Sequence, residues 1–388
     1  MSTKLDLLED SSEVEVNESK CCSSKCCLIV FGVILMVLFI IIMVLRSKIE
    51  KFDVVLRRQI NNHMKKYNIP GATFCISKNG TVLMNEGFGK KDIMNPMNAS
   101  NVLRVASISK TITSVAIMIL IERGVINMDD KVFGVGGLLG TKYGTAPYNH
   151  NVSLITLRDL LLHQSGFKNE PFDPVFVNHS LSHQQLFSWA IDSYFVPVKP
   201  GTEYSYSNFG YLVLGRIIEE ITLMTYENFV KTTIFAPNGI SDCRIGKNSL
   251  AERYEDESMY FGQDGEDPYF FNLERLDSAG GWVASSQSLV KFLRALITGK
   301  IINSTTMNTM MVTSQIQDYL GSGFMVANKV LFASGSLPGT SSFEVCSSLN
   351  GFEWAYIFNS RNVSKDYLTD VQLSMVWSTL NSPWVLWK

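Results

Sequence analysis

The sequence predicts a mixed α and β domain (an α/β protein of the α+β type), with strands near both ends of the chain and helices between them. Residues 72–89, "ATFCISKNGTVLMNEGFG", alternate well enough for two strands, and Asn79-Gly80 is the strongest two-residue signal for a hairpin turn. Helical patterns fill most of the space beyond this hairpin, and a last helix fits Lys365–Leu380. Further strand-like runs lie near the C-terminus: Val330–Ala333, Ser342–Ser347 and Trp354–Phe358.

An acidic, serine-rich segment and a long apolar run come first in the chain. Residues 1–26 have the composition of a disordered tail. Residues 27–45, "CLIVFGVILMVLFIIIMVL", are uncharged throughout, and at about 1.5 Å per residue such a helix can cross a bilayer core of about 30 Å. A cleaved signal peptide fits less well, because the run exceeds the usual core of about 7–15 residues. The sequence therefore predicts a membrane anchor at 27–45, ahead of a domain over 49–388.

The composition limits the kinds of partner and cofactor. With 388 residues, 46% of them hydrophobic and 18% charged, the chain can bury one large core or two lobes. Its net charge of −2 comes without a cluster of basic residues, so we predict no nucleic-acid partner. The five histidines lack a metal-ligand spacing, and "GVGGLLG" at 134–140 lacks both the dinucleotide fingerprint and the P-loop ending. We expect no metal and no cofactor.

Three cysteines follow the apolar run, at Cys75, Cys243 and Cys346. They form no C-x-x-C pair, and an odd number of cysteines cannot all pair within one chain. We interpret them as buried small hydrophobic residues, and a single bridge between Cys75 and Cys346 stays open as an alternative.

A candidate nucleophile stands at the head of an apolar helix, in Ser107-Ile108-Ser109-Lys110. A serine hydroxyl attacks a carbonyl only when a neighbouring base takes its proton. Residues i and i+3 of a helix lie on one face, about 5–6 Å apart at Cβ, so Lys110 can reach Ser107. The amine must be neutral to act as the base, and burial favours the neutral form. Tyr206-Ser207-Asn208, in a turn-rich loop, would add a second proton carrier and an amide that orients these groups or holds the substrate.

Both motifs occur a second time in the chain, so their context decides between the copies. Ser288 to Lys291 repeats the first spacing and Tyr226 to Asn228 the second, each within an ordinary amphipathic helical pattern. The run Thr111–Ile121 is instead apolar on nearly every face, as in a helix buried in a core. We therefore predict that the first turn of that helix, with Ser107, faces a cleft or an adjoining lobe.

Five segments together resemble the serine β-lactamase-like and penicillin-binding protein family, of the class C type. They are "LRVASISKTITSVAIMILIERG", "ITLRDLLLHQSGF" with Gln164 in place of a threonine, "PGTEYSYSNFGYLVLGRIIEEITLMTY", "SAGGWVASSQSLVKFLRAL" and "ASGSLPGTSS". They follow the family's order and spacing over roughly residues 60 to 360. The resemblance implies an antiparallel sheet flanked by helices plus a mostly helical lobe. It places the sheet lobe at about 49–106 and 325–388, and the helical lobe at about 107–324.

The resemblance also implies a role for each site residue. Ser107, Lys110 and Tyr206 would be catalytic, and Asn208 would position the acyl group of the substrate. In the third active-site strand, Gly335 and Ser336 would bind substrate, with the backbone N–H groups of Ser107 and Ser336 forming the oxyanion hole. His163 is interpreted as a structural residue of its loop, because Lys110 and Tyr206 already provide the proton transfer.

One position departs from the family pattern. The third motif should begin with lysine or histidine, and this chain has Ala333 there. In the family that cation helps to hold a substrate carboxylate and tunes the Tyr and Lys pair, and alanine can do neither. The sequence therefore supports the fold more strongly than it supports β-lactam or D-alanyl-peptide chemistry.

The orientation of the predicted anchor is argued from its flanks. Lys and Arg residues are more frequent after the span than before it, which favours a cytosolic C-terminal domain. The opposite orientation is favoured by a cysteine cluster that suits palmitoylation, by the acidic tail and, weakly, by glycosylation sequons after the span. With the family analogy, these predict a type II glycoprotein whose catalytic domain is extracellular or lumenal. The cysteines are Cys21, Cys22, Cys26 and Cys27, and the sequons begin at Asn79, Asn98, Asn151, Asn178, Asn303 and Asn362.

The predicted function is that of a membrane-anchored serine hydrolase. It would act through an acyl-enzyme on Ser107, with an ester, an amide or a small peptide as substrate. A catalytically inactive relative used for binding or assembly is the first alternative, motivated by Ala333. A true β-lactamase or D-alanyl-D-alanine carboxypeptidase is the second. The sequence does not name the natural substrate, because the loops at about 168–199 and 245–275 carry no readable motif.

Overall fold

The computed structural model describes residues 31–41, 43, 50–169, 172–193, 196–327, 329–348, 350–364, 380 and 385–386. The chain divides into two units, residues 1–55 with 381–388, and residues 56–380. Within the first unit, β1 (Glu50–Lys51) pairs in parallel with β11 (Val385–Leu386). The second unit contains the central sheet and every residue of the predicted site.

The prediction of a single-pass membrane protein is wrong. Among the residues that the structure describes, no helix is both long and apolar enough to cross a membrane. The extracellular or lumenal placement and the glycosylation that depended on this anchor lose their basis. The predicted tail at 1–26 lies outside the described residues, as does the predicted helix at 365–380 apart from Leu380.

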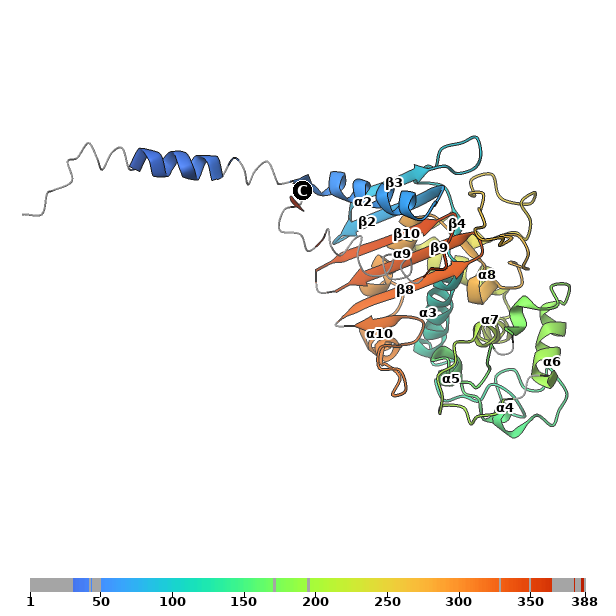
Figure 1. Ribbon diagram of the computed structural model, residues 1–388. Helices are drawn as coiled ribbons and strands as arrows, with labels where there is room; N and C mark the ends of the chain where they lie inside the picture. The colour runs from blue at the N-terminus through green and yellow to red at the C-terminus, as the bar shows by residue number, and fades with distance from the viewer. Residues whose placement is uncertain are drawn as a thin grey trace, which may run out of the picture. The chain divides into compact units, whose positions relative to one another are not determined.

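A six-stranded antiparallel sheet forms the centre of the second unit (Figure 1). Its order is β3-β2-β10-β9-β8-β7, so the N-terminal pair β3-β2 joins the C-terminal strands in one sheet through β2 and β10, in agreement with the prediction of strands near both ends of the chain. The predicted hairpin is present, because Asn79 and Gly80 both have positive φ between β2 and β3. The strands are β2 (Gly71–Lys78), β3 (Thr81–Gly89), β7 (Met325–Ala327), β8 (Val330–Leu337), β9 (Thr340–Ser347) and β10 (Phe352–Phe358).

Helices cover the sheet and fill the segment between β3 and β7 (Figure 1). The helix α9 packs against β10, β2 and β9, and α3 packs against α7. The helices are α2 (Phe52–Lys66), α3 (Ser109–Glu122), α4 (His150–Leu154), α5 (Leu157–Leu161), α6 (His183–Ser193), α7 (Asn208–Thr222), α8 (Tyr226–Val230), α9 (Ser286–Ile297) and α10 (Ser304–Met311). Single turns lie at η1 (Ala106–Ile108), η2 (Pro174–Phe176), η3 (Lys231–Phe235), η4 (Ala236–Asn238) and η5 (Asp277–Gly281). A second small sheet has the order β4 (Leu103–Arg104), β6 (Trp282–Ala284), β5 (Arg244–Ile245).

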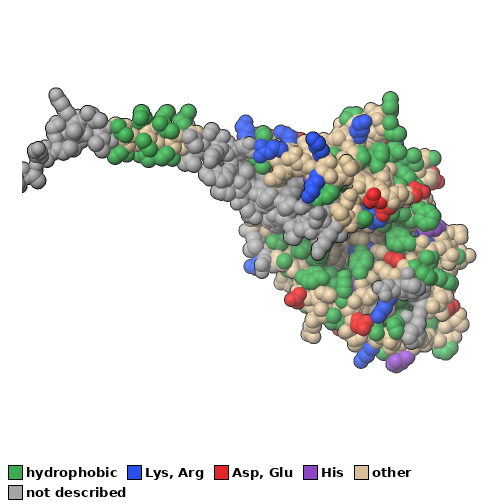
Figure 2. Space-filling view, viewed as in Figure 1, with side chains coloured by type: hydrophobic (Ala, Val, Ile, Leu, Met, Phe, Trp, Pro, Cys, Tyr) green, Lys and Arg blue, Asp and Glu red, His purple; other side chains and the backbone are tan. Residues whose placement is uncertain are grey.

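The helix α3 is the centre of the core. Every residue from Ser109 to Leu120 is buried, as predicted from a run that is apolar on nearly every face. Figure 2 shows one face of the molecule, where Lys and Arg side chains gather. They lie where Figure 1 shows α2, β2 and β3. Cys75, Cys243 and Cys346 are free and buried, so the interpretation as small hydrophobic residues holds and the alternative bridge is absent.

Candidate active site

The nucleophile candidate Ser107 lies in the strained turn η1, immediately before α3. Ala106, the residue before it, is fully buried and has φ +48, a conformation that costs an L-residue about 1–2 kcal/mol. Strain of this kind persists only where the surrounding structure enforces it, and it is frequent at functional sites. The chain therefore enters Ser107 through a strained backbone conformation at Ala106.

Strands β8 and β9 of the central sheet hold this turn in place. Ser342, on the neighbouring strand β9, donates from its hydroxyl to the Val105 carbonyl at 2.7 Å. A Cβ on Gly335 would stand 2.2 Å from the Val105 carbonyl oxygen and 3.0 Å from the Ser107 backbone nitrogen. Only glycine allows the strand to approach the turn this closely. The predicted residue Gly335 thus lies against the backbone of Ser107, and Ser336 follows it on the same strand.

Lys110 reaches back to Ser107 from the first turn of α3. Its Nζ lies 3.1 Å from the Ser107 Oγ, 2.7 Å from the Asn208 Oδ1 and 2.5 Å from the Ala279 carbonyl oxygen. The side chain is 3% exposed, and burial lowers the pKa of Lys110 to about 7, although the charge of Asp173 opposes that change. Near neutral pH a large fraction of the amine is therefore uncharged and able to accept a proton.

Tyr206 contacts the same serine from the other side. Its hydroxyl donates to the Ser107 Oγ at 2.6 Å, and the Lys110 Nζ lies 4.9 Å from the centre of its ring. Burial raises the pKa of Tyr206, and the hydrogen bond with Ser107 opposes that change. The phenol is therefore protonated at neutral pH and can donate. One edge of the ring faces a cavity, since 36% of the side chain is exposed.

Asn208 completes the cluster at the start of α7. Its Oδ1 accepts from Lys110, and its Nδ2 donates to the Asp173 Oδ2 at 2.6 Å. The preceding Ser207 caps the helix by accepting from the Gly210 backbone N–H at 3.0 Å. The fold thus brings together four of the predicted residues from segments about a hundred positions apart: Ser107, Lys110, Tyr206 and Asn208.

His163 has the structural position that the sequence suggested. Its Nδ1 accepts from the Ser207 backbone N–H at 3.1 Å, and its ring lies 4.6 Å from the ring of Tyr206. Burial, with a smaller effect from Lys110, lowers the pKa of His163 to about 3. The imidazole is therefore neutral, and it fixes the loop that carries Tyr206.

Two cavities border β8, the strand that carries Gly335 and Ser336. One of about 170 Å³ is lined by Ser107, Lys110, Tyr204, Tyr206, Tyr319 and Ala333, among others. One of about 530 Å³ begins at Ser336 and is lined mainly by apolar side chains, with Glu266 and Arg361 forming an ion pair in its wall. The Arg361 Nη1 also donates to the Ser336 Oγ at 3.2 Å. The first cavity therefore includes Ser107 itself, and the second reaches the same strand β8 at Ser336 and Leu337.

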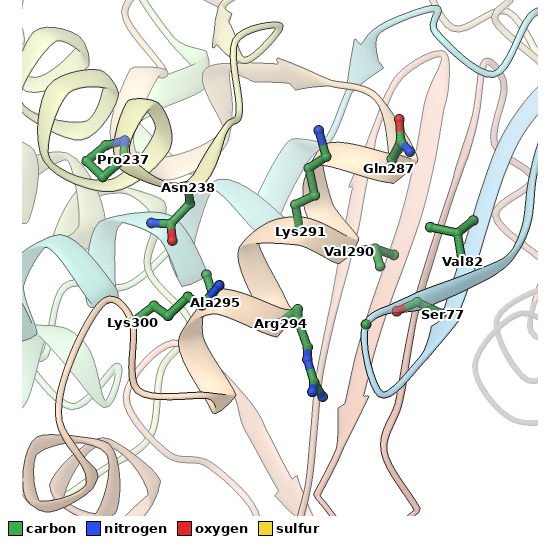
Figure 3. Close-up of a pocket in the computed structure, with 11 residues that line it drawn as sticks. Ser77, Val82, Pro237, Asn238, Gln287, Val290, Lys291, Arg294, Ala295 and Lys300 are labelled. Carbon is green, nitrogen blue, oxygen red and sulfur yellow. The ribbon is translucent and has the colours of Figure 1, made fainter.

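The second copies of the two motifs do not assemble a site. Lys291 lines a separate cavity of about 330 Å³ on α9, shown in Figure 3, and its Nζ donates to the Gly239 carbonyl at 3.1 Å. Ser288 is buried in the first turn of α9. The Tyr226 hydroxyl is buried between Thr113 and the Trp282 indole. The repeated motifs therefore lie apart from one another and from the Ser107 cluster.

Two acidic residues of the site were missed from the sequence. Asp173 contacts Asn208, and Glu344 lies beside Ala333 on the neighbouring strand. The only local signal for Asp173 is its position before Pro174, the pattern of a helix cap. Nothing in the local sequence indicates that Glu344 is buried, because its burial comes from the pairing of strands.

Comparison with known proteins gives matches over most of the chain. The family model described as Beta-lactamase matches residues 56–373. The penicillin-binding protein PbpX of Bacillus subtilis (strain 168), described as putative, is 30% identical over 299 residues, which are 75% of this chain and 71% of PbpX. Protein flp of Staphylococcus aureus (strain MRSA252) is 28% identical over 198 residues, 50% of this chain and 39% of flp. The chain therefore spans well under half of the second relative.

Solved structures show the same fold. The octameric penicillin-binding protein homologue from Pyrococcus abyssi has a TM-score of 0.69 at 23% identity, covering 83% of this chain and 77% of that chain. The D-amino acid amidase from Ochrobactrum anthropi SV3, complexed with L-phenylalanine amide, has a TM-score of 0.69 at 22% identity, covering 85% and 98%. At these identities the structures establish the fold alone.

Proposed function

The chain belongs to the beta-lactamase family, and on that basis we propose that it is a serine hydrolase acting through an acyl-enzyme on Ser107. The observation that carries the proposal is the position of the Ser107 Oγ, 3.1 Å from the Lys110 Nζ and 2.6 Å from the Tyr206 hydroxyl. A nucleophile with a buried amine on one side and a phenol donor on the other has both proton carriers that acyl transfer needs.

Acylation follows from this geometry. The neutral amine of Lys110 takes the proton of Ser107 as the Oγ bonds to the substrate carbonyl carbon. The backbone N–H groups of Ser107 and Ser336 would stabilise the oxyanion, a contribution of about 10²–10³ in rate per donor. The Tyr206 hydroxyl gives its proton to the leaving group as the bond from the carbonyl carbon to that group breaks. Lys110 then returns the first proton to Tyr206.

Deacylation reverses these roles. Lys110 takes a proton from water as the water oxygen bonds to the acyl carbon, and Tyr206 gives its proton to the Ser107 Oγ as the ester bond breaks. Lys110 then returns its proton to Tyr206. Asn208, whose amide lies beside Lys110, would position the acyl group in both steps. Each cycle therefore consumes one water and leaves every side chain in its starting state.

We propose an ester, an amide or a small peptide as substrate. Related proteins include penicillin-binding proteins and a D-amino acid amidase, which support acyl compounds of this class. The alanine at 333 provides no cation for a carboxylate, so we expect uncharged leaving groups to be preferred. The class C type, and the division into a sheet lobe at about 49–106 and 325–388 and a helical lobe at about 107–324, are part of the same proposal.

A non-catalytic binding protein is the second candidate. Ala333 favours it, because a site that has lost one functional side chain can have lost its chemistry while keeping its fold. β-Lactamase or D-alanyl-D-alanine carboxypeptidase activity is the least supported, for the same reason.

Hydrolysis of a panel of substrates distinguishes these candidates. Full-length protein is assayed with p-nitrophenyl esters, amino-acid p-nitroanilides of both hands and a chromogenic cephalosporin. We expect ester or anilide turnover with kcat/KM at least about 10³-fold lower in Ser107→Ala. Equal rates in the two proteins, or no turnover of any class by a folded sample, support the binding candidate.

A further inference from the structure

Asp173 uses both of its carboxylate oxygens in fixed hydrogen bonds. The Oδ1 accepts from the Val175 backbone N–H at 3.0 Å, which caps the turn η2, and the Oδ2 accepts from the Asn208 Nδ2 at 2.6 Å. The Asn208 Oδ1 is then directed at the Lys110 Nζ, 2.7 Å away. If the amide were turned over, its oxygen would face a carboxylate, which cannot donate a hydrogen bond. Asp173 therefore determines which end of the amide faces Lys110.

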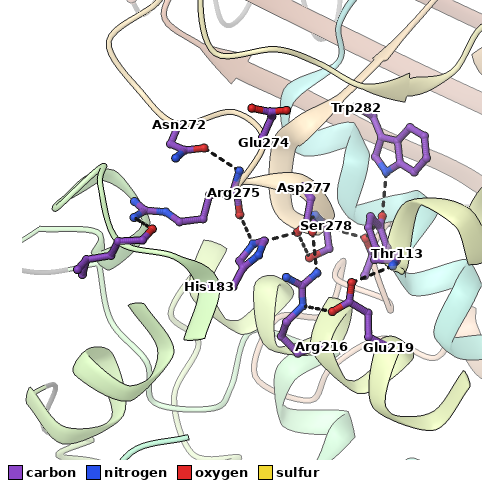
Figure 4. A network of polar contacts seen from close by, with 12 residues as sticks. Thr113, His183, Arg216, Glu219, Asn272, Glu274, Arg275, Asp277, Ser278 and Trp282 are labelled. Atoms are coloured by element: carbon purple, nitrogen blue, oxygen red, sulfur yellow. Dashed lines mark hydrogen bonds and ion pairs between the residues drawn. The ribbon is translucent and has the colours of Figure 1, made fainter. Parts of the chain in front are cut away.

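The segment that follows Asp173 is held by a buried arginine. The Arg275 guanidinium donates to four backbone carbonyls, those of Val175, Val177, Asn178 and Leu181, at 2.7–3.1 Å. Figure 4 shows the Arg275 side chain extending to this segment, while its own carbonyl accepts from the ring of His183 at 2.8 Å. Behind it, Arg216 and Asp277 form a buried ion pair at 2.6 Å. Asp173 is thus held by its own hydrogen bonds with Val175 and Asn208, and Arg275 fixes the segment that follows it.

Asp173 is also a source of negative charge for the amine of Lys110. The other groups that face this amine are the Ala279 carbonyl, the Ser107 hydroxyl, the Asn208 amide and the rings of Tyr206 and Tyr211, with Nζ 5.7 Å from the Tyr211 ring centre. Burial raises the pKa of both phenols, and the pKa of His163 is lowered to about 3, so these groups are uncharged at neutral pH. Burial lowers the pKa of Lys110, and among the described residues the charge of Asp173 is the one that raises it again.

We propose that Asp173 is a positioning residue of the hydrolase: it orients the Asn208 amide against Lys110 and supplies the negative charge that faces this amine. The inference rests on the proposed function, in which Lys110 is the base. It goes beyond that function because it assigns a role to a side chain outside the five segments that carry the family resemblance.

The test uses Asp173→Ser in the full-length protein. Serine keeps an oxygen for the cap on Val175 but has no charge and is too short to hold Asn208. We expect kcat to fall about 10- to 100-fold, as for a misplaced catalytic group. Loss of the negative charge also lowers the pKa of Lys110, so the rising limb of the pH profile of kcat/KM moves to lower pH. The matched control is Asp129→Ser, which removes an exposed carboxylate paired with Arg158.

Two results would overturn the inference. One is an Asp173→Ser variant with the thermal stability of the Asp129→Ser control and with the kcat and pH midpoint of the wild type. The other is a lower kcat in Asp173→Ser with the pH midpoint of the wild type, combined with an equally low kcat in Asp173→Glu, which keeps the charge. A readout independent of turnover is the titration of the Lys110 side chain by NMR. A downward shift in Asp173→Ser without any hydrolysis by the wild type would remove the proposed function and leave the electrostatic role of Asp173.

Discussion

Ala333 of β8 lies directly opposite Glu344 of β9 in the central sheet. Glu344 is fully buried, its Oε1 accepts from the Thr111 hydroxyl at 2.9 Å, and no described residue donates to its Oε2. Burial raises the pKa of Glu344 to about 8. At the position where the family resemblance implies a lysine or histidine, this chain therefore has a methyl group beside a carboxyl that is mostly protonated at neutral pH.

Ala333→Lys should restore an anion-binding function to the site. Side chains of paired residues stand about 4.5–5.5 Å apart at Cβ, so the new ammonium can pair with Glu344 and also reach the cavity beside Ser107. We expect kcat/KM for an ester with a carboxylate in its leaving group to rise at least about 10-fold relative to its methyl ester, equivalent to about 1.4 kcal/mol. Ala333→Met is the control for side-chain length. An equal ratio in both variants would contradict this role for position 333.

Glu344 should make the stability of the protein depend on pH in the weakly acidic range. Its folded pKa is raised, so the folded state keeps a proton that the unfolded state loses above about pH 4.5. The free energy of unfolding therefore falls as pH rises from about 4.5 to 8. Glu344→Gln keeps the bond with Thr111 and removes the titration, so its advantage over the wild type should grow by up to a few kcal/mol across this window. Urea unfolding at pH 5 and pH 8 measures it, and a constant difference would be the contrary result.

Lys110 should determine the rising limb of the activity profile. Only the neutral amine accepts the proton of Ser107, and its pKa is about 7, so kcat/KM should increase from pH 6 to 8 and then level off. No fall is expected at moderately alkaline pH, because the pKa of Tyr206 is raised. Lys110→Arg cannot become neutral and should lose about 10²–10⁴ in rate together with the rising limb. A rising limb retained in that variant would assign the base to another group.

Gly335→Ala should damage the site through the backbone. The added Cβ would stand 2.2 Å from the Val105 carbonyl oxygen, so β8 must move away from the turn that carries Ser107. The N–H of Ser336 would move with it, and we expect kcat/KM to fall about 10²-fold or more. Gly32→Ala, at a position with open space around it and no positive φ, shows the effect of the same substitution outside the unit that contains the site. Similar kinetics in the two variants would argue against an oxyanion hole at this strand.

The sequence predicted those parts of the site that depend on local spacing. Ser107 and Lys110 are three residues apart on one helical turn, so their 3.1 Å contact follows from helix geometry. The hairpin at Asn79-Gly80 is equally local. Tyr206 and Asn208 were found through family motifs, which carry nonlocal information that periodicity does not.

The remaining features depend on contacts between distant segments. Asp173 and Asn208 are 35 positions apart, and Glu344 is buried only because β8 and β10 both pair with β9. Strand β8 also runs to Leu337, four residues beyond its predicted end at Ala333, since cross-strand pairing with β9 compensates for the low strand propensity of Ser334 to Ser336. The membrane prediction relied on the length and apolar composition of residues 27–45, and no helix among the described residues is long and apolar enough to cross a membrane.

Covalent labelling of Ser107 tests most directly whether Lys110 activates this serine. Full-length protein is treated with a fluorophosphonate probe near pH 8, and the adduct is located by mass spectrometry of its peptides. We predict a single adduct on Ser107, absent from Ser107→Ala and strongly reduced in Lys110→Met, with Ser288 unlabelled in all three. A folded wild type that carries no adduct at Ser107, or one labelled equally in the Lys110→Met variant, would contradict the claim that Lys110 activates Ser107.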